Sequence, residues 1–117
     1  MSRLIDNGDG TVTDIQTGLD WQKAVSRADW FAASKMVAPN GWRCPTKYEL
    51  FGLQEAYAAQ PHGLPDSPAE FFWSSSEYDD GRAWLVHFGN GYVSYGNRSG
   101  NYAVRLVRAS PQASFRF

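Results

Sequence analysis

The histidines and carboxylates are the residues of this sequence that could perform acid–base chemistry, but their spacing does not assemble a catalytic site. His62 lies in a proline-rich stretch and His87 lies among apolar residues. Neither is accompanied by a Gly-x-Ser-x-Gly element, a second histidine at metal-binding spacing or a phosphate-binding loop. Four carboxylates cluster near a predicted turn, where acidic residues are ordinary: Glu70, Glu77, Asp79 and Asp80. We therefore expect a protein that is not an enzyme.

The glycine-rich loop near the amino terminus has the acidic residues of a calcium site but not their spacing. If Gly10 stood at the invariant glycine of a calcium-binding loop, the first ligand position would be Ile5 and the twelfth would be Gln16. Neither side chain suits those positions. Residues 7–10, Asn-Gly-Asp-Gly, instead favour a β-hairpin turn, because such turns need positive φ. We expect no metal site and no cofactor.

Composition and charge exclude several classes of partner. The 117 residues carry a formal net charge of −1, whereas a nucleic-acid partner requires a clustered surplus of Lys and Arg. No apolar run approaches a membrane span. Cys44 is the only cysteine, so no internal disulfide can form, and the amino terminus carries no apolar run like that of a signal peptide. These features predict a cytoplasmic protein, and a virion-associated one would share them.

The pattern of apolar residues in the first half predicts a hairpin and then two helices. Strands are expected at residues 3–6 and 11–14, with a short extended segment at 19–22. The first helix should begin at Ser26 and end at residues 38–41, since apolar residues recur at helical spacing between them. The second should run from a capping box at Thr46 and Glu49 to about Ala59. Its buried stripe is Leu50, Leu53 and Tyr57.

From Phe71 onward the pattern changes to period two with frequent turns. Strands are expected at residues 71–75, 83–88, 92–95 and 102–108. Strands, two helices and then a meander indicate an α+β fold with antiparallel pairing, because parallel neighbours would need a crossover helix. We expect a single domain over residues 1–110 and a carboxy-terminal tail over 111–117. The apolar residues at 115–117 of this tail should dock on their own domain.

Several motifs in order carry a resemblance to a known family. They are DNGDGTVTD, TGLDWQKA, GWRCPTKYEL, FFWSSSEY, AWLVHFGNGYVSYGN and YAVRLVR, within residues 3–108. The chain resembles the Lcl C-terminal domain family, named after the carboxy-terminal domain of a bacterial collagen-like adhesin. The resemblance implies a C-type-lectin-like fold, with an amino-terminal hairpin, two helices and then an antiparallel meander whose loops carry ligands. It also implies a homotrimer.

Individual positions match or depart from the family pattern. The resemblance gives Arg43, Pro45 and Glu49 a structural role at the start of the second helix. It places Trp73, Ser74 and Ser75 in an FWSS element, Trp84 in an AW element, Gly91 and Tyr92 in an NGY element, and Arg105 in the last strand. Cys44 stands where Leu is usual and Leu106 where Cys is common. The acidic and amide pairs that hold sugar in calcium-dependent lectins are missing, so ligand binding should be calcium-independent.

The segment of residues 90–102, NGYVSYGNRSGNY, is the candidate recognition surface. Its glycines explain the turns, but a solvated hairpin does not require its Tyr, Ser and Asn, which are the residues that antibody paratopes use. Strand alternation places Tyr92 and Ser94 on one face, and Val93 and Tyr95 on the other. With neighbouring residues, the predicted ligand-binding set is Trp73, Ser75, Tyr78, Trp84, His87, Tyr92, Ser94, Tyr95, Asn97, Arg98, Asn101 and Tyr102.

The predicted function is therefore a noncatalytic ligand-binding module. Aromatic anchors with a polar rim suit a protein partner, and a sugar ring could stack on the same side chains. One alternative is a phage- or prophage-encoded inhibitor that binds a host protein. Another is a structural subunit of a homo-oligomeric, trimeric adhesin-like assembly. We expect no nucleic-acid or membrane partner.

Overall fold

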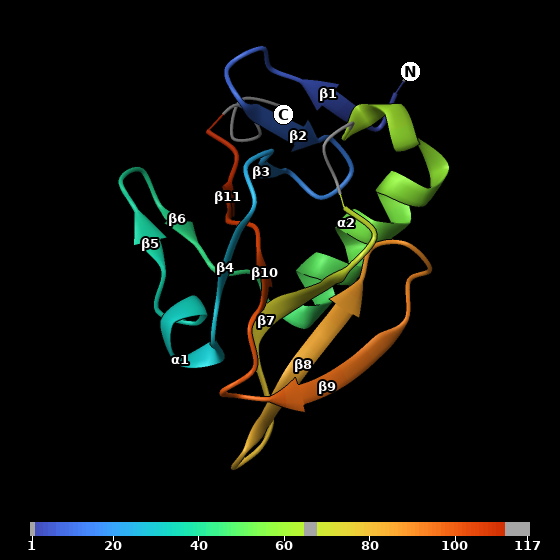
Figure 1. The fold of residues 1–117 in the computed structure, drawn as a ribbon. Helices are drawn as coiled ribbons and strands as arrows, with labels where there is room; N and C mark the ends of the chain where they lie inside the picture. The colour runs from blue at the N-terminus through green and yellow to red at the C-terminus, as the bar shows by residue number, and fades with distance from the viewer. Residues whose placement is uncertain (1, 65–67, 112–117) are drawn as a thin grey trace.

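The computed structural model describes residues 2–64 and 68–111, which form two β-sheets, two α-helices and one 3-10 turn (Figure 1). The first sheet has the order β1-β2-β3-β11-β6-β5 and the second β4-β10-β7-β8-β9. The predicted docking of residues 115–117 lies outside the described residues. The elements are β1 Leu4–Asp6, β2 Thr11–Asp14, β3 Leu19–Gln22, β4 Ser26–Ala28, α1 Trp30–Ala33, β5 Val37–Ala38, β6 Trp42–Arg43, α2 Lys47–Ala59, η1 Pro61–Gly63, β7 Phe71–Asp79, β8 Arg82–His87, β9 Val93–Asn97, β10 Tyr102–Val104 and β11 Val107–Ala109.

The predicted amino-terminal hairpin is confirmed. β1 and β2 pair antiparallel with Leu4 opposite Asp14, and β3 continues the sheet on the other side of β2. Gly8 and Gly10 take φ values of +78° and +90°, which glycine adopts without a steric penalty. The Asp9 carboxylate accepts the Thr11 N–H and so belongs to the turn itself.

The first predicted helix is much shorter than expected. α1 covers only Trp30–Ala33. It begins at Trp30 because the Asp29 side chain caps it by accepting the Ala32 N–H. Ser26–Ala28 forms β4, which pairs antiparallel with β10, and Val37–Ala38 forms β5, which pairs with β6. The apolar spacing was therefore misleading here, since pairing with strands distant in sequence overrides a weak helical preference.

The second helix is confirmed with the predicted bounds and cap. α2 spans Lys47–Ala59, and Thr46 with Glu49 forms a capping box at its start. Leu50 and Leu53 are buried, and Tyr57 packs partly buried against the same core. α2 thereby covers one face of the second sheet around Phe72, Val86 and Phe88.

The predicted meander holds for three strands but not for the fourth. β7, β8 and β9 pair in sequence, each antiparallel to the next. Residues 102–108 form two strands rather than one, and β10 lies parallel to β7 on the side away from β8, with Ala103 opposite Phe72. The expectation of purely antiparallel pairing is thus wrong, because β8 and β9 supply the crossover for which we had required a helix. β11 crosses to the first sheet, where it pairs with β3 and β6.

Two buried clusters hold the elements together. One joins the first sheet, α2 and part of the second sheet through Trp21, Leu50 and Phe72. The other lies around Trp73 and Val104, under α1. Among the described residues, no helix is both long and apolar enough to cross a membrane.

Candidate binding surface

Three aromatic side chains contact one another where the second sheet extends beyond α2. The rings of Tyr78 and Tyr95 are stacked, with centroids 4.0 Å apart and an interplanar angle of 14°. Trp84 packs edge-on against both, at 4.9 Å from Tyr78 and 6.1 Å from Tyr95. The two tyrosines remain 40% and 43% exposed despite these contacts. We call these three residues, with the flanking cations Lys47 and Arg82, the aromatic surface.

Strand register explains why these rings share one face. Trp84 in β8 lies directly opposite Tyr95 in β9, and residues paired across strands project to the same side. β7 has register shifts between Trp73 and Asp79, and such irregularities bend a strand and redirect its side chains. Tyr78 lies in this irregular part of β7, and its ring stacks on Tyr95.

Two cations border the rings. The Lys47 Nζ atom lies 3.9 Å from the centroid of the Trp84 ring. The Arg82 guanidinium lies 5.1 Å and 4.9 Å from the centroids of Tyr78 and Tyr95, within the range of cation–π attraction. Arg82 also forms an ion pair with Asp79, and this hydrogen-bonded guanidinium lowers the pKa of the Asp79 carboxyl.

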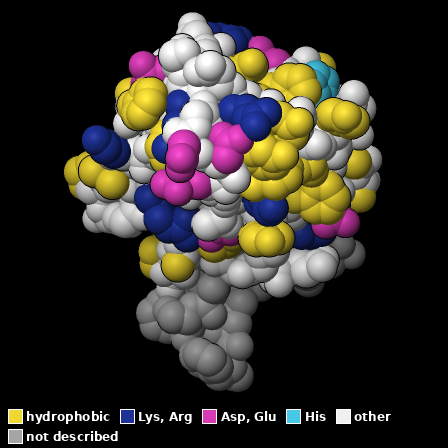
Figure 2. All heavy atoms as spheres, turned by 90° about the horizontal axis from the view of Figure 1, so that it is seen from below, with side chains coloured by type: hydrophobic (Ala, Val, Ile, Leu, Met, Phe, Trp, Pro, Cys, Tyr) yellow, Lys and Arg dark blue, Asp and Glu magenta, His cyan; other side chains and the backbone are white. Residues whose placement is uncertain are grey.

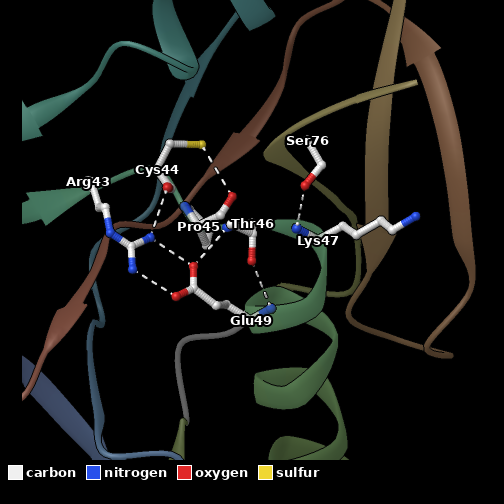
Figure 3. Close-up of polar contacts among 7 residues, drawn as sticks. All are labelled: Arg43, Cys44, Pro45, Thr46, Lys47, Glu49 and Ser76. Atoms are coloured by element: carbon white, nitrogen blue, oxygen red, sulfur yellow. Dashed lines mark hydrogen bonds and ion pairs between the residues drawn. The ribbon is translucent and has the colours of Figure 1, made fainter. Parts of the chain in front are cut away.

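The start of α2 fixes the position of Lys47 (Figure 3). The Glu49 carboxylate accepts the Thr46 N–H at 2.9 Å and two N–H groups of Arg43 at 2.8 Å and 2.7 Å. The Lys47 N–H donates to Ser76 Oγ at 3.0 Å, which ties the helix start to β7. With its backbone held on both sides, Lys47 extends its side chain over Trp84.

The charge of Glu49 is stabilised by the same network. Burial alone would raise the pKa of Glu49, but the hydrogen bonds from Arg43 and Thr46 outweigh it, so the net pKa lies below the usual value. The structural role expected for Arg43 and Glu49 is confirmed by these bonds. Pro45 shares that role, because its carbonyl accepts the Ser75 N–H at 2.7 Å.

Beside the aromatic surface lies an apolar pocket that the sequence did not predict. It has a volume of about 250 Å³ and is lined by Lys47, Tyr48 and Phe51 of α2 and by Val93 of β9. Tyr48 and Phe51 are 77% and 38% exposed. The only signal in the sequence was that both residues are aromatic and lie off the buried stripe of the helix. We call this the α2–β9 pocket.

Figure 2 shows the face of the molecule that includes the β7–β8 turn. Hydrophobic side chains gather on one side of this face, and Lys and Arg side chains lie at their border. Within residues 2–64 and 68–111, six of the nine exposed large hydrophobic residues belong to α2, β7, β9 or the turn before β9: Tyr48, Phe51, Tyr78, Tyr92, Val93 and Tyr95. The exposed hydrophobic area is therefore concentrated around the aromatic surface and the α2–β9 pocket.

Trp73 and its neighbours do not belong to this surface. Trp73, which the sequence placed in the ligand-binding set, is fully buried, and its Nε1–H donates to the Ala28 carbonyl at 3.0 Å. Tyr102 is partly buried with its ring edge-on to Trp73 at 5.0 Å. His87 packs edge-on against Phe71 at 4.8 Å. Ser75 is half-buried as well, beside the helix start.

The polar residues of the predicted set mostly support turns. Arg98 hydrogen-bonds to the Asp79 carbonyl, its guanidinium lies 4.4 Å from the Trp30 ring centroid, and its side chain is only 13% exposed. The Asn97 Oδ1 atom accepts the Ser99 N–H. Asn101 is exposed in the turn before β10. Arg98 also donates to the Arg82 carbonyl, so these polar residues support the turns that border the aromatic surface.

The residues of the 90–102 segment that lie in or just before β9 do not all face the same side of the sheet. Val93 and Tyr95 lie with Trp84 on the face of the sheet that α2 partly covers, as their pairing with Val86 and Trp84 shows. Ser94 is half-buried on the opposite face, and Tyr92, 62% exposed, lies just before the strand. Tyr95 is therefore a surface residue rather than a core residue.

Cys44 is buried, and its surroundings favour the protonated thiol. Burial raises the pKa of its thiol to about 12, and the reactive form of cysteine is the thiolate. Its Sγ atom lies 3.8 Å from the Pro45 carbonyl oxygen. Among the described residues no group of three or more His, Cys, Asp or Glu side chains is arranged to hold a metal ion.

The two sheets, the capped helix and the aromatic surface define a small α+β domain with an exposed aromatic face. The sequence profile of the Lcl C-terminal domain matches residues 10–108, so the chain belongs to the Lcl C-terminal domain family. No curated protein matched the chain in a sequence comparison.

Proposed function

We propose that the protein is a noncatalytic binding module that recognises a partner protein through the aromatic surface. The observation that carries the proposal is the contact of Tyr78, Trp84 and Tyr95 on the part of the second sheet that α2 leaves uncovered. Contiguous exposed apolar patches on a soluble domain mark interaction sites more often than isolated apolar residues do. The rings are held together before any partner binds, which reduces the entropy cost of binding.

The chemistry of the surface favours a protein over a sugar. Tyr, Trp and Arg are the residues enriched in the energetically important centre of protein interfaces, and Tyr78, Trp84 and Arg82 meet here. The faces of Tyr78 and Tyr95 are stacked on each other, so each of these rings keeps only one face on which a sugar ring could stack. The α2–β9 pocket extends the apolar area beyond what a single sugar ring needs.

The proposal also covers the fold and the absence of a catalytic role. We take the two-sheet arrangement to be C-type-lectin-like, with the ligand surface on β7–β9 and the helix start. The only histidine whose side chain the structure describes supports a noncatalytic role, because the His87 Nδ1 atom accepts the Gly89 N–H and its ring packs on Phe71.

A comparison of matched variants tests the proposal. Wild type, Trp84→Ala and Phe31→Ala would be immobilised and incubated with bacterial lysate, and retained proteins would be identified by mass spectrometry. Phe31 is the control, because it is a 52% exposed aromatic residue in α1, away from the aromatic surface. Circular dichroism would establish that each variant is folded.

The proposal predicts a protein retained by wild type and Phe31→Ala and lost with Trp84→Ala. Equal retention by all three variants would contradict it. If no protein is retained and a sugar panel shows Trp84-dependent binding, the partner is a glycan. A stable trimer in solution scattering that Trp84→Ala dissociates would instead identify the surface as a contact between copies of the chain.

A further inference from the structure

β9 is an edge strand of the second sheet. Among the described residues, it is the last strand in the order β4-β10-β7-β8-β9 and pairs only with β8. Figure 1 shows it along the outer side of β8, with no other strand beyond it. An edge strand presents backbone N–H and C=O groups that can pair with another extended chain.

Two backbone hydrogen bonds determine which residues of β9 face β8. The His87 N–H donates to the Tyr92 carbonyl at 2.8 Å, and the Arg98 N–H donates to the Gly81 carbonyl at 3.0 Å. Both pairs follow the register of β8 and β9. Because hydrogen-bonded pairs alternate along an antiparallel ladder, the even-numbered residues of β9 bond to β8.

The odd-numbered residues therefore direct their backbone groups to the free edge. The backbone N–H and C=O groups of Ser94 and Gly96 hydrogen-bond to β8, whereas those of Val93 and Tyr95 point away from it. The Asn97 carbonyl accepts the Gly100 N–H at 2.8 Å and is not available. The open part of the edge is thus the stretch beside the aromatic surface.

The α2–β9 pocket lies along this open stretch. Val93 belongs both to the pocket and to the open edge, and Tyr48 and Phe51 form the helical wall opposite. A groove between a helix and an edge strand suits an extended peptide, because its backbone pairs with the strand while alternate side chains enter the groove.

Lys47 gives the groove an unbalanced positive charge. Seven other cationic residues of the described part form ion pairs with carboxylates: Arg3, Lys23, Arg27, Arg43, Arg82, Arg98 and Arg108. Among the described residues Lys47 forms none, and its Nζ atom lies over the rings of Trp84 and Tyr48. A carboxylate on the incoming chain would supply the missing counter-charge.

We propose that an extended segment of the partner protein adds to β9 as a further strand, with an apolar side chain in the α2–β9 pocket and a neighbouring carboxylate at Lys47. This inference rests on the proposed function and names the form of its ligand. A second copy of this chain fits less well, because β9 itself, Val-Ser-Tyr-Gly-Asn, carries no carboxylate to offer Lys47.

Peptide selection provides the probe for a test. A phage-displayed library of random decapeptides would be selected on immobilised wild-type protein, and the enriched peptide synthesised. The expected peptide contains a large apolar residue with Asp or Glu close by. Lys47→Gln should weaken its binding by about twofold to fivefold, the range for loss of one solvent-exposed ion pair. Replacing the peptide's acid by its amide should remove that difference.

Amide hydrogen exchange then tests strand addition directly. In the free protein the N–H groups of Ser94 and Gly96 should be protected, and those of Val93 and Tyr95 should exchange quickly. Binding of the peptide should protect Val93 and Tyr95, and N-methylation of alternate peptide amides should abolish binding with a period of two residues.

Three outcomes would overturn the inference. The first is a bound peptide that leaves exchange at Val93 and Tyr95 unchanged. The second is protection of these amides in the peptide-free protein that is lost on dilution, which would identify a second copy as the occupant. The third is failure to select any peptide while Trp84→Ala still loses a protein from lysate; strand addition is then wrong although the proposed function stands.

Discussion

Replacing Glu49 tests how the start of α2 is held. Glu49→Ala removes the acceptor for the Thr46 N–H and both hydrogen bonds from Arg43. Loss of a cap costs about 1 kcal/mol, and loss of charged hydrogen bonds costs about 1.5–3 kcal/mol. Because the Arg43 side chain is 43% exposed and can be hydrated again, we expect a total near 2 kcal/mol. This corresponds to a Tm lower by roughly 6–10 °C.

Urea unfolding followed by tryptophan fluorescence would measure this change, with Glu49→Gln as the matched control. Glutamine can retain the bond to the Thr46 N–H, as in other capping boxes, but it lacks the charge that pairs with Arg43. It should therefore cost less than alanine, about 1 kcal/mol. An alanine variant as stable as wild type would refute the role assigned to Glu49.

The same pair of proteins has an expected pH dependence. The net pKa of Glu49 is lowered in the folded protein, so its charge contributes stability that is complete above the unfolded pKa of about 4.3. That contribution is lost as the pH falls through the lower folded pKa. The free-energy difference between wild type and Glu49→Gln should be constant from neutral pH to about 5 and shrink below about 4. A difference that grows on acidification would show that the sign is wrong.

Three further predictions concern buried or constrained positions. Cys44, whose thiol has a pKa raised to about 12 by burial, should resist alkylation at pH 8 in the folded protein and react once urea unfolds it; prompt labelling of the native protein would contradict this. Trp73→Ala should cost about 3–5 kcal/mol in urea unfolding and Trp84→Ala clearly less, since only Trp73 is fully buried; equal costs would argue against that assignment. Gly91→Ala should destabilise by at least about 1 kcal/mol, because alanine is disfavoured at its φ of +73° and a Cβ would lie 2.8 Å from Gln54 Oε1; an unchanged urea midpoint would show that the turn relaxes freely.

Local signals in the sequence predicted the parts of the fold that depend on neighbouring residues. The hairpin at residues 7–10 follows from positive φ at its glycines. The start of α2 follows from Thr46 and Glu49, whose side chains satisfy backbone donors within the same turn. Both features need no knowledge of the rest of the chain.

Elements that depend on distant pairing were not predictable in the same way. Ser26–Ala28 is a strand because β10 lies beside it, and β10 is parallel to β7 because β8 and β9 form the connection. An apolar spacing that fits a helix gives no information on such partners. The predictions of a long first helix and of a single strand at residues 102–108 were wrong for this reason.

The candidate site shows the same division. Trp73 and Trp84 both lie in strands with similar surroundings in the sequence. Their assignment to core or surface requires knowing that Trp73 packs under α1, whereas Trp84 lies beside the start of α2. Tyr48 and Phe51 could be placed off the buried stripe of α2, but their contribution to a pocket depends on the position of Val93 in β9. Local sequence alone does not indicate that Tyr78 and Tyr95 meet, because their stacking is a consequence of the β7 irregularity and the β8–β9 register.

Site-specific photo-crosslinking in cells tests the central claim most directly. A photoreactive phenylalanine analogue would replace Tyr48, which is 77% exposed in the α2–β9 pocket, or Phe31, which is 52% exposed in α1. The proposed function predicts a covalent adduct with a partner protein from position 48, absent when Trp84→Ala is introduced, and none of that adduct from position 31. The same adduct from both positions, or one from position 31 alone, would contradict binding through the aromatic surface.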